Sequence, residues 1–185
     1  RAMGIAVVIT LRQPAEMACV KKESAVAMHR AGRLRIRPHH LMCMTCFYGE
    51  RFKQGPISED NLFEAIAIVH RQPNVPIELI EGPCMICAPC PELHLRSGKC
   101  VGSQGMSLRD ELKDLQALQQ LGLKYGDVWP ARTLFKRLFQ RIKTTRTLCS
   151  FDGVVRGPEW TICRNPKGSP GYVKGRAKGL GFLKL

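Results

Sequence analysis

The spacing of apolar and polar residues along the chain predicts an α+β protein built from short strands and several helices. Residues 33–37 alternate basic and apolar side chains, which is the period of a half-buried strand. A second strand is predicted over residues 77–81, which are rich in isoleucine and leucine and end before a Gly-Pro pair. Pro38 suits the first turn of a helix, so a helix is predicted from there to Gly49.

Helical spacing predicts further helices along the chain. Residues 15–29 have moderate helix propensity, and Ser58 is the expected N-cap of a helix that follows it. A helix from Ser107 carries a stripe of leucines that we expect to pack in the core: Leu108, Leu112, Leu115 and Leu118. A last helix is predicted after Pro130, and the glycine-rich residues from Pro166 onward are expected to be irregular.

Cysteines are concentrated in one short loop. Cys84, Cys87 and Cys90 recur at every third position, and Cys100 follows after a few residues. A tight loop with this spacing directs several thiolates to one centre, as iron–sulfur clusters and structural zinc require. The chain has nine cysteines in 185 residues, an odd number in a chain too long to need disulfide staples. The pattern favours metal binding, with disulfides or buried thiols as the alternative.

More metal-binding residues lie on the helix predicted to begin at Pro38. Cys43 and Cys46 would share one face of this helix, and His39 and His40 would lie one turn from Cys43. The helix can therefore present two thiolates and at least one imidazole to a common centre. In the alternative interpretation, the two histidines are buried and bond to backbone carbonyls.

The order of these motifs is similar to that of a known family. The motifs are Arg37-Pro-His-His-Leu-Met-Cys43, Ile86-Cys87-x-x-Cys90-Pro91 and Cys100, followed by Gly-Leu-x-x-Gly-x-x-Trp over residues 122–129. From about residue 33 to the region of Cys163, the chain resembles short bacterial and archaeal proteins of unknown function suspected of binding iron–sulfur clusters. The resemblance implies a ligand set of Cys43, Cys87, Cys90 and Cys100, with His39 and His40 beside it. It implies no particular activity.

Four more cysteines form a second candidate set: Cys46, Cys84, Cys149 and Cys163. Together the two sets would supply the eight thiolates of two [4Fe-4S] clusters and leave Cys19 over. We therefore predict one such cluster, and a second if the C-terminal part folds back so that Cys149 and Cys163 reach the others. Zinc is the alternative cofactor, because cysteine spacing alone does not separate it from iron.

The formal net charge of +14 predicts an acidic partner. A cluster held by four thiolates carries about −2, which offsets only a small part of this charge. The outer face of the last predicted helix is the main candidate surface, with Lys136, Arg137, Arg141, Lys143 and Arg146. An acidic redox protein is the expected partner, and nucleic acid is the alternative. No apolar run reaches the length of a membrane span, so a cytoplasmic protein is expected.

These observations lead to three functional hypotheses. The first is an iron–sulfur protein that transfers electrons or serves as a redox subunit. The second is an iron–sulfur enzyme with an open iron site for a small substrate, with His39, His40 or Glu81 as acid or base, so whether the chain is an enzyme stays open. The third is a zinc-binding nucleic-acid module, although aromatic residues are only 6% of the chain. The expected organisation is an N-terminal extension (1–32), an iron–sulfur-binding domain (33–165) and a basic, glycine-rich tail (166–185).

Overall fold

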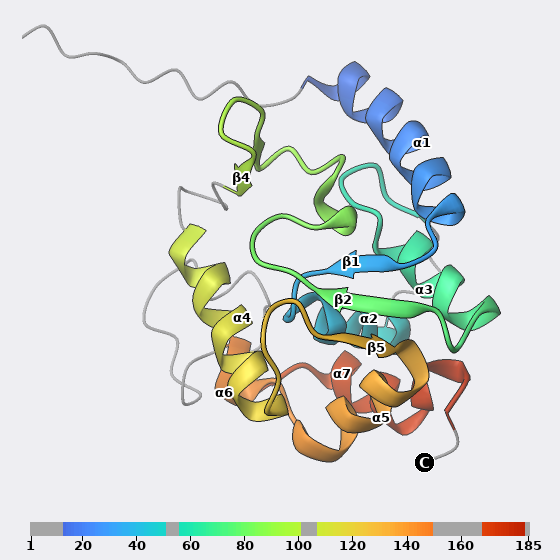
Figure 1. The fold of residues 1–185 in the computed structure, drawn as a ribbon, viewed down its shortest axis with the longest axis vertical. Helices are drawn as coiled ribbons and strands as arrows, with labels where there is room; N and C mark the ends of the chain where they lie inside the picture. Colours follow the sequence, from blue (N-terminus) through green and yellow to red (C-terminus); the bar gives the residue numbers. More distant parts are fainter. Residues whose placement is uncertain (1–12, 51–55, 101–106, 150–167, 184–185) are drawn as a thin grey trace, which may run out of the picture.

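The computed structural model describes residues 13–50, 56–100, 107–149 and 168–183 (Figure 1). In these ranges the chain combines helices with two small sheets, which confirms the predicted α+β class. The helices and strands are α1 (Pro14–Arg30), β1 (Leu34–Ile36), α2 (His40–Glu50), α3 (Leu62–Arg71), β2 (Pro76–Leu79), β3 (Leu93–His94), β4 (Lys99–Cys100), α4 (Ser107–Leu121), β5 (Val128–Pro130), α5 (Ala131–Arg141), α6 (Arg146–Cys149) and α7 (Pro170–Ala177).

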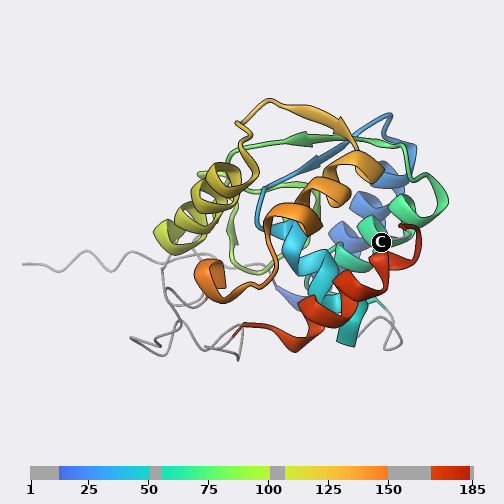
Figure 2. The same cartoon turned by 90° about the horizontal axis from the view of Figure 1, so that it is seen from below.

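The larger sheet has three strands in the order β1–β2–β5. Strands β1 and β2 are parallel, with Leu34 opposite Ile77, and β5 is antiparallel to β2, with Trp129 opposite Ile77. The alternation predicted for the first strand is confirmed, because Leu34 and Ile36 are buried and Arg35 is exposed. Figure 2 shows the three strands along one side of the molecule, with α2, α5 and α7 packed beneath them. Strands β3 and β4 form a separate hairpin near the opposite end from α5 (Figure 1).

Helix α7 corrects the expectation that the C-terminal region is irregular. The hydroxyl of Ser169 accepts a hydrogen bond from the backbone N–H of Tyr172, and Pro170 occupies the first turn, so the sequence carries ordinary start signals. Gly171 and Gly175 allow α7 to lie directly on α2, since a Cβ atom at Gly175 would collide with the carbonyl oxygen of Thr45. Packing on α2 therefore stabilises a helix that glycine content alone disfavours.

Helix α4 forms where predicted, but its leucine stripe does not face the core. Leu108 is 77% exposed and Leu115 is 54% exposed, whereas Leu118 is buried. The buried side of α4 instead carries Asp114, which is ion-paired with the buried guanidinium of Arg37. This ion pair sets the rotation of the helix, so the prediction of a leucine core face is wrong for its N-terminal part.

Helix α3 begins later than predicted. It starts at Leu62, because the carboxylate of Asp60 accepts a hydrogen bond from the Leu62 amide at 2.7 Å, and Ser58 lies outside the helix. The helix predicted over residues 15–29 is confirmed as α1. Among the helices of the described ranges, none combines the length and apolar character that crossing a membrane requires.

Candidate metal centre

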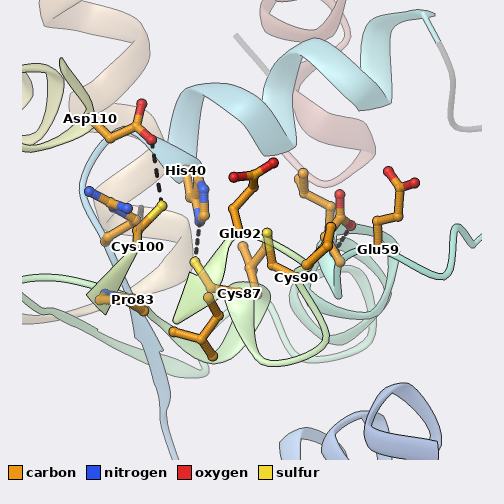
Figure 3. Close-up of a pocket in the computed structure, with 14 residues that line it drawn as sticks. His40, Glu59, Pro83, Cys87, Cys90, Glu92, Cys100 and Asp110 are labelled. Atoms are coloured by element: carbon orange, nitrogen blue, oxygen red, sulfur yellow. Dashed lines mark hydrogen bonds between the residues drawn. The ribbon is translucent and has the colours of Figure 1, made fainter. Parts of the chain in front are cut away.

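The candidate metal centre lies where the start of α2 meets the loop after β2 (Figure 3). This loop contains the short 3-10 turn η2 (Met85–Cys87), which brings Sγ of Cys84 and Sγ of Cys87 to 3.8 Å from each other. Nδ1 of His40, the first residue of α2, lies 3.2 Å from Sγ of Cys84 and 4.0 Å from Sγ of Cys87. We call His40, Cys84 and Cys87 the metal triad, since these three side chains have the geometry to hold a metal ion.

The separations within the metal triad match those of ligands around one tetrahedral ion. Zinc binds cysteine sulfur at about 2.3 Å and histidine nitrogen at about 2.0–2.1 Å. Tetrahedral angles then place two sulfurs about 3.8 Å apart, and a sulfur and a nitrogen about 3.6 Å apart. The observed sulfur–sulfur distance is 3.8 Å, and the two sulfur–nitrogen distances of 3.2 and 4.0 Å bracket the expected value. One ion therefore fits the triad with only small movements of the side chains.

Backbone amides favour the thiolate form of Cys84. Burial raises the pKa of Cys84, but hydrogen bonds from the Cys87 thiol and from the backbone amides of Arg37, Ile86 and Cys87 outweigh burial and bring this pKa below its ordinary value. The hydrogen bond to Cys84, together with burial, raises the pKa of Cys87 well above its ordinary value. Of the two thiols, Cys84 therefore loses its proton more readily, and a bound metal cation would displace the proton of Cys87 as well.

A cavity of about 290 Å³ adjoins the metal triad. Its wall contains the imidazole of His40 and three cysteines from two separate segments, Cys87, Cys90 and Cys100 (Figure 3). Cys100 belongs to β4, and its Sγ atom lies 3.9 Å from a carboxylate oxygen of Asp110 at the start of α4. The hairpin and α4 therefore both contribute to the wall of the cavity. Carboxylates also contribute to its wall: Glu59, Asp60, Glu92 and Asp110.

The thiol of Cys90 favours the protonated state unless a cation is nearby. Burial, together with negative charge on Cys87, Cys100 and Glu92, raises the pKa of Cys90 to about 12, against a backbone hydrogen bond at Glu92 that lowers it. Thiols that are gathered in this way repel one another as thiolates. A bound metal removes that repulsion, since it is the largest local positive charge in such a site and binds thiols in their deprotonated form.

A buried charge network connects α4 to the residues just before α2 and stabilises the start of this helix. Asp114 of α4 is fully buried and contacts the Arg37 guanidinium at 2.6 Å and 2.8 Å. The other carboxylate oxygen of Asp114 accepts hydrogen bonds from the backbone N–H of His39 at 2.9 Å and from the His39 ring at 2.8 Å. We call these three residues the Asp114 network. It ties α4 to the segment that carries His40.

The Asp114 network also fixes the orientation of the His39 ring. Burial lowers the pKa of His39 to about 4 despite the adjacent carboxylate, so the ring is neutral at pH 7 and its contact with Asp114 is a hydrogen bond rather than an ion pair. Nδ1 therefore carries the proton that it donates to Asp114, and Nε2 keeps its lone pair. A carboxylate that holds a histidine in this way is the usual support of a metal-binding histidine.

His39, His40 and Cys43 form a second group that could hold a metal ion. The metal-binding atoms of this group lie within 4.8 Å of one another, and the group shares His40 with the metal triad. The turn at the start of α2 thus places both histidines and Cys43 close together, as the helical spacing predicts. Cys43 does not line the cavity, whereas the other three cysteines implied by the resemblance do.

The described residues do not test the second predicted cysteine set as a whole. Cys84 belongs to the metal triad, and in the parts of the chain that are described no metal-binding group of three side chains includes Cys46 or Cys149. Both of these cysteines lie near Tyr172, where their negative charge would add to the effect of burial in raising the pKa of Tyr172. Cys163 lies outside the described residues, so the second set stays a prediction.

Sequence reasoning does not identify Asp114 as part of the site. Asp114 is 77 residues from Arg37 and sits between leucines on a helix whose apolar stripe suggests a different inward face. The only local signal is an arginine followed by two histidines in a segment that is otherwise apolar and buried. Such a segment needs a buried counter-charge, but its position in the chain cannot be found from the segment itself.

The fold and the site together define a small α+β protein with cysteine and histidine side chains that could hold a metal ion. A family model described as a protein of unknown function, DUF1284, matches residues 59–152, which is just over half of the chain, and the chain belongs to this family. The matched residues include the η2 loop, Cys100 and Asp114, but not the segment from Arg37 to Cys43. Comparisons with curated proteins and with solved structures gave no match.

Proposed function

We propose that this protein binds an iron–sulfur cluster in the cavity beside the metal triad, and that the cluster transfers electrons. The main support for this proposal is a single cavity of about 290 Å³, which is lined by three cysteines and one histidine from three segments of the chain. Cys87 and Cys90 come from the η2 loop, Cys100 from the hairpin and His40 from α2. A single metal ion needs no cavity of this size, whereas a four-iron cluster does.

The donor set suits a four-iron cluster. Each ligand of such a cluster binds a different iron, so the ligands must surround a volume and lie roughly 6 Å apart rather than converge on a point. Cys87, Cys90 and Cys100 would be the thiolate ligands. His40 would be the fourth after its ring turns away from Cys87, because Nδ1 of His40 and Sγ of Cys87 lie only 4.0 Å apart. The cluster would supply a one-electron redox centre, and the residues around it would set the potential through burial and hydrogen bonds. If His40 does not bind, the fourth iron is open, which is the arrangement that the enzyme hypothesis requires.

The distances within the metal triad favour a second candidate function. A sulfur–sulfur distance of 3.8 Å is too short for two thiolates on different irons of a four-iron cluster, but it fits two thiolates on one zinc ion. In this case His40, Cys84 and Cys87 would be zinc ligands, and the centre would stabilise the fold instead of carrying electrons. Substitution of Cys84 can distinguish the iron–sulfur cluster from the zinc ion, because Cys84 belongs to the triad but does not line the cavity.

The test is metal analysis of the full chain purified without oxygen, with iron, acid-labile sulfide and zinc measured per chain. For a cluster in the cavity, we expect about four irons and four sulfides. Cys100→Ser should lose most of the iron, and Cys84→Ser should keep it. Cys19→Ser is the matched control, since Cys19 is exposed on α1. Stoichiometric zinc without sulfide, lost in Cys84→Ser and kept in Cys100→Ser, would reject the cluster and favour the zinc centre.

A further inference from the structure

Acidic and basic residues are unevenly distributed over the described parts of this protein. Each aspartate and glutamate that the structure describes lies before Val128, including the four that line the metal cavity. The described residues 128–149 and 168–183 contain nine lysines and arginines and no acidic residue. These residues form α5, α6 and α7, at the lower end of the molecule in Figure 1, whereas the β3–β4 hairpin lies at the upper end. Among the described residues, the excess positive charge therefore lies at one end of the fold.

Apart from Arg132, which lies over the ring of Phe182, five of these basic side chains are exposed and lie on α5, on α7 or just after them. We call them the basic pole: Lys136, Arg141, Lys143, Lys174 and Lys178. Within the described parts of the chain, none of the five forms an ion pair with a carboxylate. Lysines near the ends of helices also interact with the helix dipole, and Lys143 donates a hydrogen bond to the carbonyl of Phe139. The dipole does not explain Lys136 in the middle of α5, or the absence of acidic residues from α5 and α7 themselves.

We propose that the basic pole binds the phosphate backbone of duplex DNA without sequence specificity. An interface with an acidic protein needs an apolar centre within the charged rim. On α5 and α7, Val173 is the only large apolar side chain found exposed among the described residues. Contacts with phosphates need only dispersed lysines and arginines on a surface of the right charge. The composition of the basic pole therefore suits a polyanionic backbone better than a folded acidic partner.

The aromatic residues near the basic pole favour a duplex over a single strand. Proteins that bind single strands stack bases on open aromatic rings. Here the guanidinium of Arg137 lies over the ring of Trp129 at 5.7 Å, and that of Arg132 lies over the ring of Phe182 at 6.0 Å. Both rings are also partly buried. Of the aromatic rings that the structure describes near the basic pole, none therefore offers bases an open stacking surface, and contact is left to the backbone. This inference does not depend on which metal the protein binds.

The test is fluorescence anisotropy with a labelled duplex of about 20 base pairs, using the full chain at 50, 100 and 200 mM NaCl. The test variant is Lys136→Ala/Arg141→Ala/Lys143→Ala, which removes three exposed charges from α5 and its C-terminal end. The matched control is Arg30→Ala/Arg96→Ala/Lys99→Ala, which removes three exposed charges elsewhere. Circular dichroism and thermal melting establish that both variants are folded.

We expect the test variant to bind at least about tenfold more weakly than the unmodified chain at 100 mM NaCl. The slope of log K against log salt should become shallower by about 2.7, because each phosphate contact contributes about 0.9. The control should lose less than about threefold. Equal losses in both variants, no binding at 50 mM NaCl, or equally tight binding of a single strand of the same length would each overturn the proposal. Binding of polyglutamate but not of the duplex would instead identify an acidic protein as the partner.

Discussion

Asp114→Asn tests whether the buried charge network holds α4 against the metal centre. The substitution keeps the shape of the side chain and removes its charge. Asp114 is fully buried, and its carboxylate makes four contacts of 2.6 to 2.9 Å with Arg37 and His39. Without the carboxylate charge, the guanidinium of Arg37, which is only 2% exposed, would have lost its counter-charge in the core. Removing one partner of such a pair costs about 3–5 kcal/mol.

The assay is urea unfolding at pH 7, followed by circular dichroism, with chelator-treated protein so that metal binding does not contribute to stability. We expect Asp114→Asn to lower the free energy of unfolding by about 3–5 kcal/mol, a large part of the 5–15 kcal/mol typical of a domain. Arg37→Met/Asp114→Asn removes both charges, keeps an amide oxygen for the hydrogen bonds from His39, and should recover most of this loss. Asp127→Asn is the matched control, because Asp127 is partly exposed and asparagine keeps an oxygen for the Lys124 amide.

Two results would refute this reasoning. A loss below about 1 kcal/mol for Asp114→Asn would mean that the buried ion pair does not fix α4. A double variant as unstable as the single variant would mean that an unpaired charge is not the cause of the loss. The same protein can be titrated with zinc, since loss of the support for His39 should weaken metal binding by about 10–100-fold if His39 is a ligand.

Two further predictions concern pH and helix packing. Burial lowers the pKa of His39 to about 4 from its ordinary 6.5. As the pH falls, the His39 ring is therefore protonated in the unfolded chain before it is protonated in the folded protein. The free energy of unfolding should fall by about 3 kcal/mol between pH 6.5 and pH 4 as a result. His39→Gln should flatten this part of the profile of urea unfolding against pH, and an unchanged profile would contradict the assignment. Gly175→Ala should lower the melting temperature by destabilising the fold by about 1–3 kcal/mol or more, because the added Cβ would collide with the Thr45 carbonyl. Gly32→Ala, which meets no atom within 4 Å, is the control, and equal melting temperatures for the two variants would contradict close packing of α7 on α2.

Features that depend on neighbours in sequence could be predicted. The strand at residues 33–37 follows from its alternation, and the start of α2 follows from Pro38. The convergence of Cys84 and Cys87 follows from their spacing on a tight turn, which the structure confirms as a 3-10 turn. In each case the relevant contacts are only a few residues apart, so the local pattern contains the necessary information.

Features that depend on distant partners could not be predicted. The orientation of α4 is set by Arg37, which is 77 residues from Asp114, and this ion pair overrides the leucine pattern that suggests another face. Helix α7 depends on close contact of its glycines with α2. Periodicity describes what a segment would prefer to bury, but a buried ion pair or a close backbone contact is decided by the segment against which it packs.

The contact between α2 and α7 also has a consequence for the order of events during biosynthesis. Helix α2 carries His40 and Cys43, and it packs over much of its length on a helix that begins about 120 residues later. At a synthesis rate of about 5–20 residues per second, α7 is made roughly 6–24 seconds after α2. During this interval the cysteines and histidines at the start of α2 lack their final support. Stable metal insertion is therefore expected after translation has passed α7, when the ligands are held in place.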